Sequence, residues 1–300
     1  MSSSERPPTL DPVAAERWSA LLVRPVASPW LHEEIANRML ERLDFIRLQP
    51  KSWAHWEPLR GGIEAHQKLM QRYSKAPVWL VAKQAAHARA VHLETRGRWW
   101  QLSRWIGQAT HLEAPPAGGM EMLWANMLLH HAADPQELIA AWHRALAVDG
   151  FLMFSCFGPD TLRELRQIYV QKGWPEPAHE FTDMHDWGDM LVHAGFAEPV
   201  MDMERITLSY DNPDRLLAEL RELGRNFHGQ RFAGLRGRLW RAELTKALLS
   251  LARSDEQGRL CLTFEVVYGH ALKPMPRHKV QSQSQIGLED MRQMLGARKT

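Results

Sequence analysis

Residues 124–166 read WANMLLHHAADPQELIAAWHRALAVDGFLMFSCFGPDTLRELR, and this stretch decides the fold. The apolar run from Met120 to Asn126 predicts a strand that leads into it. Asp134-Pro135 predicts a helix start, because an aspartate can cap the first free N–H groups and proline suits the first turn. Asp149-Gly150 ends that helix, and the apolar run Phe151 to Phe157 predicts a second, buried strand. A strand, a helix and a strand in this order indicate an α/β sheet.

The rest of the chain continues the alternation of strands and helices. Apolar residues at helical spacing predict helices, and compact or alternating apolar runs predict strands. The expected helices cover residues 31–46, 64–73, 84–94, 184–193 and 213–223, and the expected strands cover residues 53–56, 78–82, 204–210 and 260–268. A doubly wound sheet is the class that this order of elements favours.

Changes in composition divide the chain into three parts. Residues 1–28 are rich in Pro and Ser, which predicts a flexible N-terminal arm. Residues 29–272 carry the alternating pattern and form the expected α/β domain. Within it, an Arg-rich and mostly helical stretch over residues 213–259 is expected to form a lid. Residues 273–300 are polar and predict a mobile C-terminal tail.

Length and charge limit the classes of protein that the chain can represent. Its 300 residues with 45% hydrophobic content suit one large α/β domain. The 37 Lys and Arg side chains nearly balance 35 Asp and Glu, so composition gives no general case for nucleic-acid binding. The cationic, aromatic residues 96–105 resemble a base-stacking patch. Such tryptophans more often pack beneath a surface segment, so nucleic acid stays a minor alternative.

Two further features concern the cellular compartment. No apolar run approaches the roughly 20 residues of a membrane-spanning helix, and the polar N-terminus lacks the apolar core of a signal peptide. Cys156 and Cys261 have no spaced partner of the CxxC kind, which suits a reducing compartment. We therefore expect a cytoplasmic protein without a membrane anchor.

Four pieces of the chain resemble one enzyme family, namely Glu41–Pro50, Asn126–Pro135, Phe157–Leu165 and Trp187–Phe196. Through them the chain from Trp30 onward is similar to the malonyl-acyl-carrier-protein O-methyltransferases of biotin synthesis, a branch of the class I S-adenosylmethionine-dependent methyltransferases. The resemblance implies a Rossmann-like, doubly wound, mostly parallel seven-stranded sheet with a helical lid. It also implies S-adenosylmethionine as cofactor and methyl transfer to a free carboxylate.

The loop after the first expected strand departs from the family pattern. In the family this strand ends in an acid and a loop of the Gly-x-Gly-x-Gly type follows. Here residues 53–62 read WAHWEPLRGG, so that His55 replaces the acid, Glu57 and Leu59 replace two glycines, and Gly61 remains. Glycine allows the turn and lets backbone N–H groups approach the ligand closely. The substitutions therefore predict weakened donor binding at this loop.

Two other donor contacts of the family are changed as well. Ala82-Lys83 stands where the second strand would end in an acid that binds the ribose, and Gln108 stands where an Asp would contact the adenine side. A lost charge-assisted hydrogen bond costs about 1.5–3 kcal/mol, so losing two or three could move a micromolar site to the millimolar range or weaker.

The resemblance implies positions for both ligands. The residues expected to border the donor are Gly61, Gly62, Gln108 and Asn126. The residues expected to contact the substrate are His130, Phe157 and Arg225, of which Arg225 would orient the carboxylate. A carboxylate is ionised at neutral pH, so no catalytic acid or base is nominated. No metal is expected, because His130 and His131 are adjacent and point in different directions on a helix.

An Arg-rich segment, residues 221–241, has two interpretations. Arginine forks could hold a substrate carboxylate and dock an acidic acyl carrier protein. The alternative is a solvated helical face without a partner.

Two functions of different kinds follow from these observations. The first is a methyltransferase of the malonyl-carrier type, and the second is a non-catalytic relative that uses the same fold as a binding or assembly partner. A third and weaker hypothesis is different chemistry on the same fold, such as arginine hydroxylation by an assembly factor.

Overall fold

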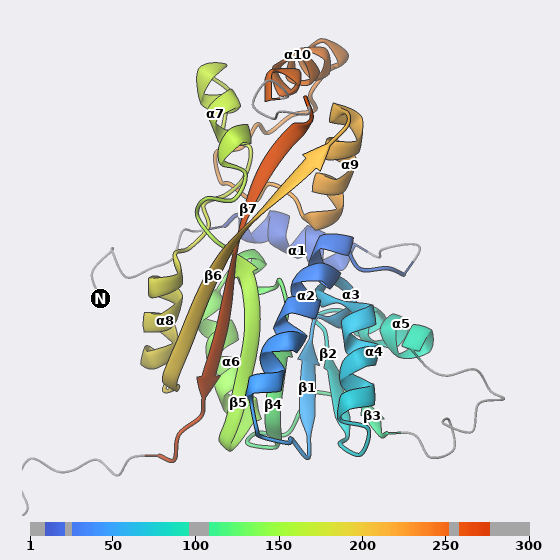
Figure 1. Cartoon of the computed structure of the whole chain (residues 1–300), viewed down its shortest axis with the longest axis vertical. Helices are drawn as coiled ribbons and strands as arrows, with labels where there is room; N and C mark the ends of the chain where they lie inside the picture. The colour runs from blue at the N-terminus through green and yellow to red at the C-terminus, as the bar shows by residue number, and fades with distance from the viewer. Residues whose placement is uncertain (1–9, 22–25, 96–107, 252–257, 277–300) are drawn as a thin grey trace, which may run out of the picture.

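A sheet of seven strands forms the centre of the molecule (Figure 1). The computed structural model describes residues 10–21, 26–95, 108–251 and 258–276. In spatial order the strands are β3 (Thr110–His111), β2 (Val78–Val81), β1 (Trp53–Trp56), β4 (Met120–Ala125), β5 (Leu146–Phe157), β7 (Leu260–Leu272) and β6 (Ala197–Tyr210). The predicted class, a doubly wound and mostly parallel seven-stranded sheet, is confirmed.

The order of the strands reverses at β1, which places a ligand site there. Trp53 of β1 pairs in parallel with Val78 of β2 on one side and with Met122 of β4 on the other. In open sheets of this kind, ligands bind beyond the carboxyl ends of the strands at such a reversal. At the far edge β7 is antiparallel and lies between β5 and β6.

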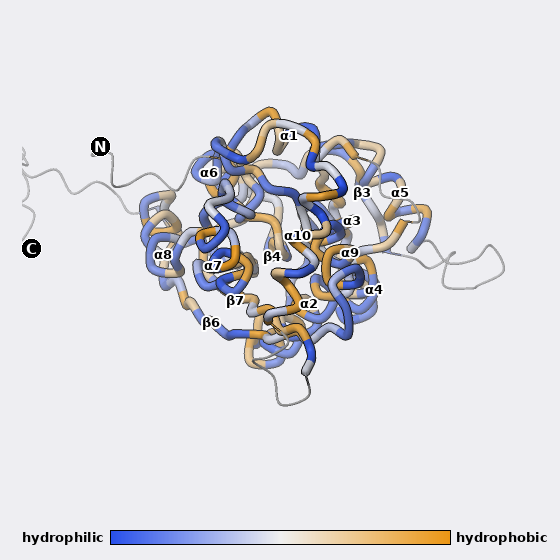
Figure 2. The backbone as a smooth tube through the Cα atoms, turned by 90° about the horizontal axis from the view of Figure 1, so that it is seen from above, coloured by the Kyte–Doolittle hydropathy of each residue, from blue (hydrophilic) through white to orange (hydrophobic). Residues whose placement is uncertain are grey.

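Two hydrophobic cores cover the two faces of the sheet, because successive side chains of a strand point to opposite faces. Leu123 and Trp124, neighbours on β4, are both fully buried but belong to different cores. The first core includes buried residues of α2 (Trp30–Arg42), α4 (Ile63–Arg72) and α5 (Ala85–Thr95), and extends to the helices at the upper end of the molecule. The second includes those of α6 (Pro135–Ala145) and α8 (Met184–His193). Seen from above, α6 and α8 lie on one side of β4 and α2 and α4 lie on the other (Figure 2).

Two helix starts that the sequence predicts are confirmed. Asp134 accepts a hydrogen bond from the N–H of Glu137 at 2.9 Å, with Pro135 in the first turn of α6. Asn212 accepts one from the N–H of Arg215 at 2.9 Å at the start of α9 (Pro213–Leu223). These side chains satisfy N–H groups that have no partner within the helix.

The segment expected to form a lid, residues 213–259, contains α9 and α10 (Arg238–Leu249). These helices lie with α7 (Arg163–Gln171) around the upper ends of β6 and β7 (Figure 1). The expected helical character over residues 225–259 holds for α10. Residues 224–237 instead form an irregular connection with one isolated bridge. Four glycines lie in these 14 residues, and glycine disfavours a helix interior.

Part of the expected N-terminal arm is helical. Helix α1 (Pro12–Ala20) starts at Asp11, whose carboxylate accepts hydrogen bonds from two backbone N–H groups. Trp18 on this helix is buried, which ties it to the domain. Residues 1–9 of the arm, the cationic aromatic segment 96–105 and residues 277–300 of the tail lie outside the described residues. No helix in the described ranges is both long and apolar enough to cross a bilayer.

Candidate functional site

The loop after β1 turns sharply into a short helix, α3 (Pro58–Gly61). Glu57 adopts a left-handed backbone with φ of 52°, a conformation that favours glycine, at a position where the family has glycine. Its N–H donates to the carbonyl of Val81 at 2.7 Å. The N–H of Lys83 donates to the Glu57 carboxylate at 2.6 Å. The Glu57 carboxylate therefore lies at the end of β2, where the sequence pattern lacks an acid.

Gly61 and Asn126, two residues expected to border the donor, lie in direct contact. The Asn126 amide donates to the carbonyl of Gly61 and, at 2.8 Å, to that of His32. Its oxygen accepts a hydrogen bond from the Ser155 hydroxyl at 2.6 Å. A Cβ on Gly61 would lie 2.9 Å from the Asn126 carbonyl oxygen, so the glycine permits this approach. Asn126 is 1% exposed, and internal bonds occupy its side chain.

The N-terminus of α4 is filled by a carboxylate of the chain itself. Such a helix end attracts anions through its free N–H groups and dipole. Here the Glu33 carboxylate accepts from the N–H of Glu64 at 3.0 Å and from that of Ala65 at 3.1 Å. Gly62, with φ of 126°, precedes the helix, and a Cβ on it would lie 3.1 Å from Glu33. A ligand carboxylate at this helix end would compete with Glu33.

A buried histidine pair stands at the end of β1, where the family has an acid. Nδ1 of His55 lies 3.2 Å from Nδ1 of His66, and both side chains are fully buried. Burial lowers the pKa of His66 to about 3 and that of His55 well below its usual range. Both rings are therefore neutral at pH 7. A neutral hydrogen-bonded pair has replaced a negative charge.

Gln108 does not reach the carboxyl edge of the sheet. It precedes β3, and its amide donates to the carbonyls of Tyr73, at 3.1 Å, and Ala76, which lie before β2. These groups lie at the amino edge of the sheet, opposite the ligand edge. The acidic residue that follows β3 on the ligand side is Glu113, which pairs with His111 at 3.0 Å. The expected donor contact of Gln108 therefore conflicts with the register of β3.

Hydrogen bonds within the chain occupy polar groups on the β1 side. Gly61 and Asn126, two residues expected to border the donor, bond to each other. The helix N-terminus beside them already holds the carboxylate of Glu33. Donor binding would require the loop 57–62 to separate from the end of β4.

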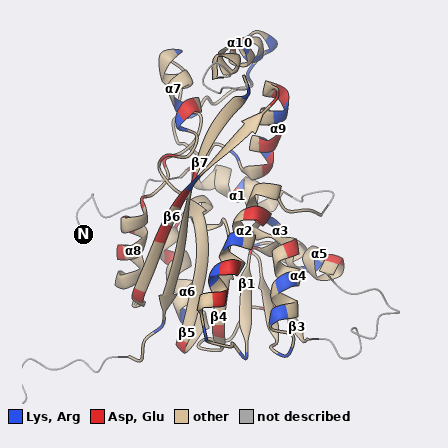
Figure 3. Cartoon of the chain, viewed as in Figure 1, with Lys and Arg blue, Asp and Glu red and all other residues tan. Residues whose placement is uncertain are grey.

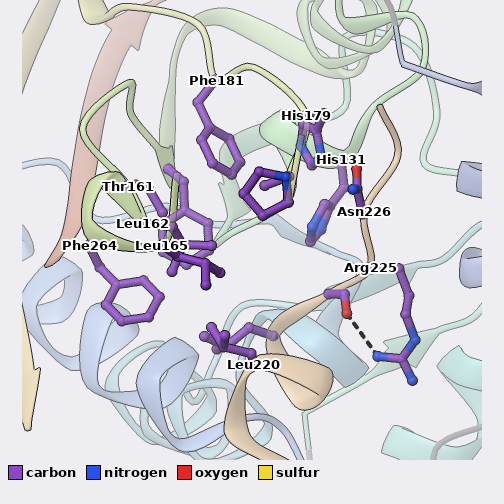
Figure 4. Close-up of a pocket in the computed structure, with 15 residues that line it drawn as sticks. His131, Thr161, Leu162, Leu165, His179, Phe181, Leu220, Arg225, Asn226 and Phe264 are labelled. Atoms are coloured by element: carbon purple, nitrogen blue, oxygen red, sulfur yellow. Dashed lines mark hydrogen bonds between the residues drawn. The ribbon is translucent and has the colours of Figure 1, made fainter. Parts of the chain in front are cut away.

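A cavity of about 120 Å³ lies on the other side of the site, between the end of β5 and the lid (Figure 4). Most of its lining side chains are apolar. The lining residues are His131, Phe157, Thr161, Leu162, Leu165, Pro177, Ala178, His179, Phe181, Leu220, Leu223, Gly224, Arg225, Asn226 and Phe264. An apolar cavity with a few polar groups is typical of a small-molecule site.

Neutral histidines support one wall of this cavity. Nδ1 of His130 accepts a hydrogen bond from the N–H of Phe157 at 3.3 Å, and His179 donates from Nε2 to the carbonyl of His130 at 3.0 Å. Burial lowers the pKa of His179 to about 4 and holds the pKa values of His130 and His131 well below their usual range. No cluster suited to a metal ion occurs within the described ranges.

Arg225 lies at the rim of the cavity. Its guanidinium donates to the carbonyls of Arg221 and Gly224 and lies 4.7 Å from the centroid of the Trp18 ring. Figure 4 shows the side chain directed away from the apolar residues Leu162 and Leu165. Its charged end therefore lies outside the apolar interior of the cavity.

The structure thus groups most of the predicted site residues. Gly61, Gly62 and Asn126 lie together on the β1 side. Phe157 and Arg225 line the cavity, and His130 packs behind Phe157 with ring centroids 4.7 Å apart.

Sequence reasoning missed Trp18 and Arg60, which meet beside Arg225. The Arg60 guanidinium lies 3.8 Å from the centroid of the Trp18 ring. A signal for α1 was present, because Asp11-Pro12 repeats the helix start seen at Asp134-Pro135. Nothing local in the sequence places Arg60 against this helix.

The most informative comparisons are with curated relatives. The chain is 40% identical over 266 residues to a malonyl-[acyl-carrier protein] O-methyltransferase of Gallionella capsiferriformans, covering 84% of this chain and 87% of that protein. Proteins of the same name from Nitrosospira multiformis and Laribacter hongkongensis are 36% and 38% identical, and the matches cover 86% and 83% of this chain and 89% and 86% of those proteins. No family model matches the chain.

Solved structures support the fold. A candidate methyltransferase from Bacillus halodurans superposes with a TM-score of 0.52 at 15% identity, covering 81% of this chain and 100% of that one. The YcgJ protein of Bacillus subtilis gives 0.51 at 10% identity and covers 80% and 99%. With the identity to the curated relatives, these matches show that the chain belongs to the malonyl-[acyl-carrier protein] O-methyltransferase family.

Proposed function

We propose that this chain is an S-adenosylmethionine-dependent methyltransferase that methylates the free carboxylate of a malonyl group on an acyl carrier protein, in biotin synthesis. The observation that carries the proposal is the apolar cavity beneath the lid, with the Arg225 guanidinium at its rim. Apolar walls suit the methylene and thioester part of such a substrate, and an arginine suits its carboxylate. The names of the curated relatives support the same reaction.

On the acceptor side, the protein's task is positioning. Arg225 orients the carboxylate, and the rings of Phe157 and Phe181 contact the apolar part of the substrate. His130 positions Phe157, because its Nδ1 accepts a hydrogen bond from the backbone N–H of Phe157. The carboxylate is already ionised at neutral pH, so the reaction needs no general base. Alignment and exclusion of water can supply much of the rate enhancement.

S-adenosylmethionine supplies the methyl group when it is bound. Gly61, Gly62 and Asn126 are the proposed donor-facing residues, on the condition that the loop 57–62 moves away from Asn126. Gln108 is withdrawn from this set, because it lies at the opposite edge of the sheet.

The Arg-rich segment 221–241 is the proposed docking surface for the carrier protein. Two of its arginines are neutralised within the chain, since Arg231 pairs with Asp11 at 2.7 Å and Arg241 with Asp214 at 2.9 Å. Arg236 stacks on the Phe232 ring at 4.0 Å, and no acidic partner is found for it in the described ranges. These observations narrow the docking surface to the irregular connection and the start of α10.

Exposed leucines lie among these arginines. Leu235 is fully exposed and Leu239 is 90% exposed. Arg238, the first residue of α10, has no ion pair with a described residue, and Figure 3 marks basic residues on this helix in blue. Apolar side chains flanked by free cations suit an acidic partner with an apolar contact.

The proposed division of the chain keeps residues 29–272 as the methyltransferase unit and adds α1 to it. Residues 273–300 are kept as a tail. Neither Cys156 nor Cys261 forms a disulfide within the described residues, which supports the cytoplasm as the proposed compartment.

The proposed function is tested by incubating the protein with malonyl carrier protein and S-adenosylmethionine and detecting the methyl ester by mass spectrometry. Calorimetric titration with the donor runs in parallel. We expect a methyl ester and a measurable binding isotherm. A flat titration at millimolar donor together with the absence of product would contradict the proposal.

A second candidate is a non-catalytic relative that binds a carrier protein. It differs from the first in what it requires of the donor side, where Asn126 and Gly61 bond to each other. It predicts carrier binding without donor binding. It fails if the protein restores growth without biotin in cells that lack the carboxyl methyltransferase.

A further inference from the structure

Two guanidinium groups from distant parts of the chain meet at one tryptophan. The Arg60 guanidinium lies 3.8 Å and the Arg225 guanidinium 4.7 Å from the centroid of the Trp18 ring. Arg60 comes from the loop that lost two glycines, and Arg225 comes from the lid. Helix α1 thus joins the rebuilt loop to the rim of the cavity.

Backbone carbonyls accept hydrogen bonds from both arginines and hold their side chains in place. A carbonyl carries no net charge, so the two positive charges are not neutralised by these contacts. Arg60 donates to the carbonyls of Trp18 at 2.7 Å and Leu21 at 3.0 Å. Arg225 donates to the carbonyls of Arg221 and Gly224. Within the described ranges, neither guanidinium has a carboxylate at ion-pair distance. Each retains N–H groups that can bind a ligand, since a guanidinium has five.

Acidic residues of α1 and of the loop after β1 have other hydrogen-bonding partners. Glu16 pairs with Lys83, and Asp11 pairs with Arg231 at 2.7 Å. The Glu57 carboxylate attracts Arg60, but it accepts its hydrogen bond from the N–H of Lys83. The fold therefore holds two neighbouring cations and directs nearby anions elsewhere.

This arrangement has an electrostatic cost that an anionic ligand would remove. Arg60 is partly buried, and burial together with repulsion from Arg225 lowers its pKa to about 10. Like charges near one another in a partly dry environment destabilise the fold. A carboxylate that accepts hydrogen bonds from both guanidiniums would offset the repulsion.

We propose that Arg60 and Arg225 form a two-arginine clamp, stacked on Trp18, for the free carboxylate of the acceptor. Arg60 is then a further substrate-binding residue for the proposed reaction, and the rebuilt loop after β1 serves the acceptor. This inference rests on the proposed function. The clamp lies at the cavity rim because Gly224 and Arg225 line the cavity, so the apolar part of the same ligand enters between Phe157 and Phe181.

The test is calorimetric binding at low salt, without a methyl donor, of three probes. They are the malonyl thioester of N-acetylcysteamine, the propionyl thioester that lacks the carboxylate, and phosphopantetheine, which carries a phosphate. The variants are Arg60→Gln, Arg225→Gln, their combination and Arg60→Lys. Arg144→Gln is the control, because Arg144 is an exposed arginine on α6.

We expect each single Gln variant to weaken malonyl thioester binding about tenfold or more. The two losses should be non-additive in the double variant, because both groups bind one carboxylate. Arg60→Lys should recover part of the affinity. Propionyl thioester binding should stay unchanged in Arg60→Gln, which separates a carboxylate contact from a general structural role. Arg144→Gln should behave as the unmodified chain.

Several outcomes would overturn the clamp. They are unchanged malonyl thioester affinity in a folded Arg60→Gln protein, equal loss for the malonyl and propionyl probes, and a wild type that binds neither. Binding of phosphopantetheine without the malonyl thioester would reassign the anion to a phosphate and overturn it too. If methyl transfer persists while Arg60→Gln binds normally, the clamp is wrong and the proposed function stands.

Discussion

The two sides of the ligand edge of this sheet differ in the residues that form them. On the β1 side, polar groups such as Asn126 and Glu33 bond to backbone atoms of the loop and of α4, and leave no space between loop and strand. On the β5 side, side chains such as Phe157 and Leu220 line a cavity beneath the lid. The comparison teaches that the two sides of one ligand edge can differ, since internal hydrogen bonds hold the β1 side together while the β5 side encloses a cavity.

The largest loss of stability is expected from Phe157→Ala, which enlarges the cavity on the β5 side. Phe157 is 4% exposed and packs against His130 and Phe181. Removing a buried phenyl ring costs about 3–5 kcal/mol of unfolding free energy. Urea denaturation measures this loss. The control is Phe232→Ala, at a half-exposed position, which should lose about 1 kcal/mol or less. Equal losses in both variants would show that the cavity wall is not a packed structure.

Asn126→Ala tests whether the donor side is sealed by hydrogen bonds. The change leaves the carbonyls of Gly61 and His32 and the Ser155 hydroxyl without their partner. We expect a loss of about 2–3 kcal/mol, because buried polar groups without partners are costly. The matched variant on the acceptor side is Asn226→Ala, which loses two part-buried bonds, one to the carbonyl of Glu176 and one from the N–H of His228, and should cost about 1 kcal/mol. A smaller loss for Asn126 than for Asn226 would contradict the sealed donor side.

The pH dependence of stability tests the buried histidines of both sides. The folded pKa is about 3 for His66 and about 4 for His179, against an unfolded value near 6.5. The unfolded chain therefore binds more protons between about pH 6.5 and 4, so the unfolding free energy should fall as pH is lowered through this window.

The measurement is the urea midpoint at pH 7, 6 and 5. Each histidine should contribute on the order of 1 kcal/mol per pH unit within the window. His66→Gln and His179→Gln should each flatten the slope, and His185→Gln, at an exposed position of α8, should leave it unchanged. A slope of opposite sign would mean that the rings are charged in the folded protein.

The fold could be read from the sequence because its signals are local. The run from Phe151 to Phe157 and the caps Asp134 and Asn212 act within one element, and all appear as predicted. Helix α1 was overlooked because Pro and Ser dominate the composition around it, although Asp11-Pro12 carries a cap signal. The irregular connection before α10 was overlooked because its arginines favour a helix. The glycines between these arginines disfavour one, and their effect prevails.

The site could be read only in part, because its decisive contacts are long-range. Phe157 and Arg225 were found through motifs, and both line the cavity. Gln108 was misplaced because the register of β3 against β2 depends on pairing, which no local pattern fixes. Arg60 was missed since its partner Trp18 lies on another element. The filled helix end at α4 depends on Glu33, which local spacing does not connect to it.

The smallest effect on stability is expected at the docking surface, which extends the comparison beyond the cavity. Leu235 is fully exposed, so Leu235→Ser should change the unfolding free energy by less than about 0.5 kcal/mol. Carrier-protein affinity should nevertheless fall severalfold, because a partner would cover this side chain together with Arg236 and Arg238. Biolayer interferometry with malonyl carrier protein measures the affinity, and Val170→Ser, at an exposed position of α7, is the control. If both serine variants bind the carrier like the unmodified chain, the docking surface lies elsewhere, and the acceptor half of the site is reached from another direction.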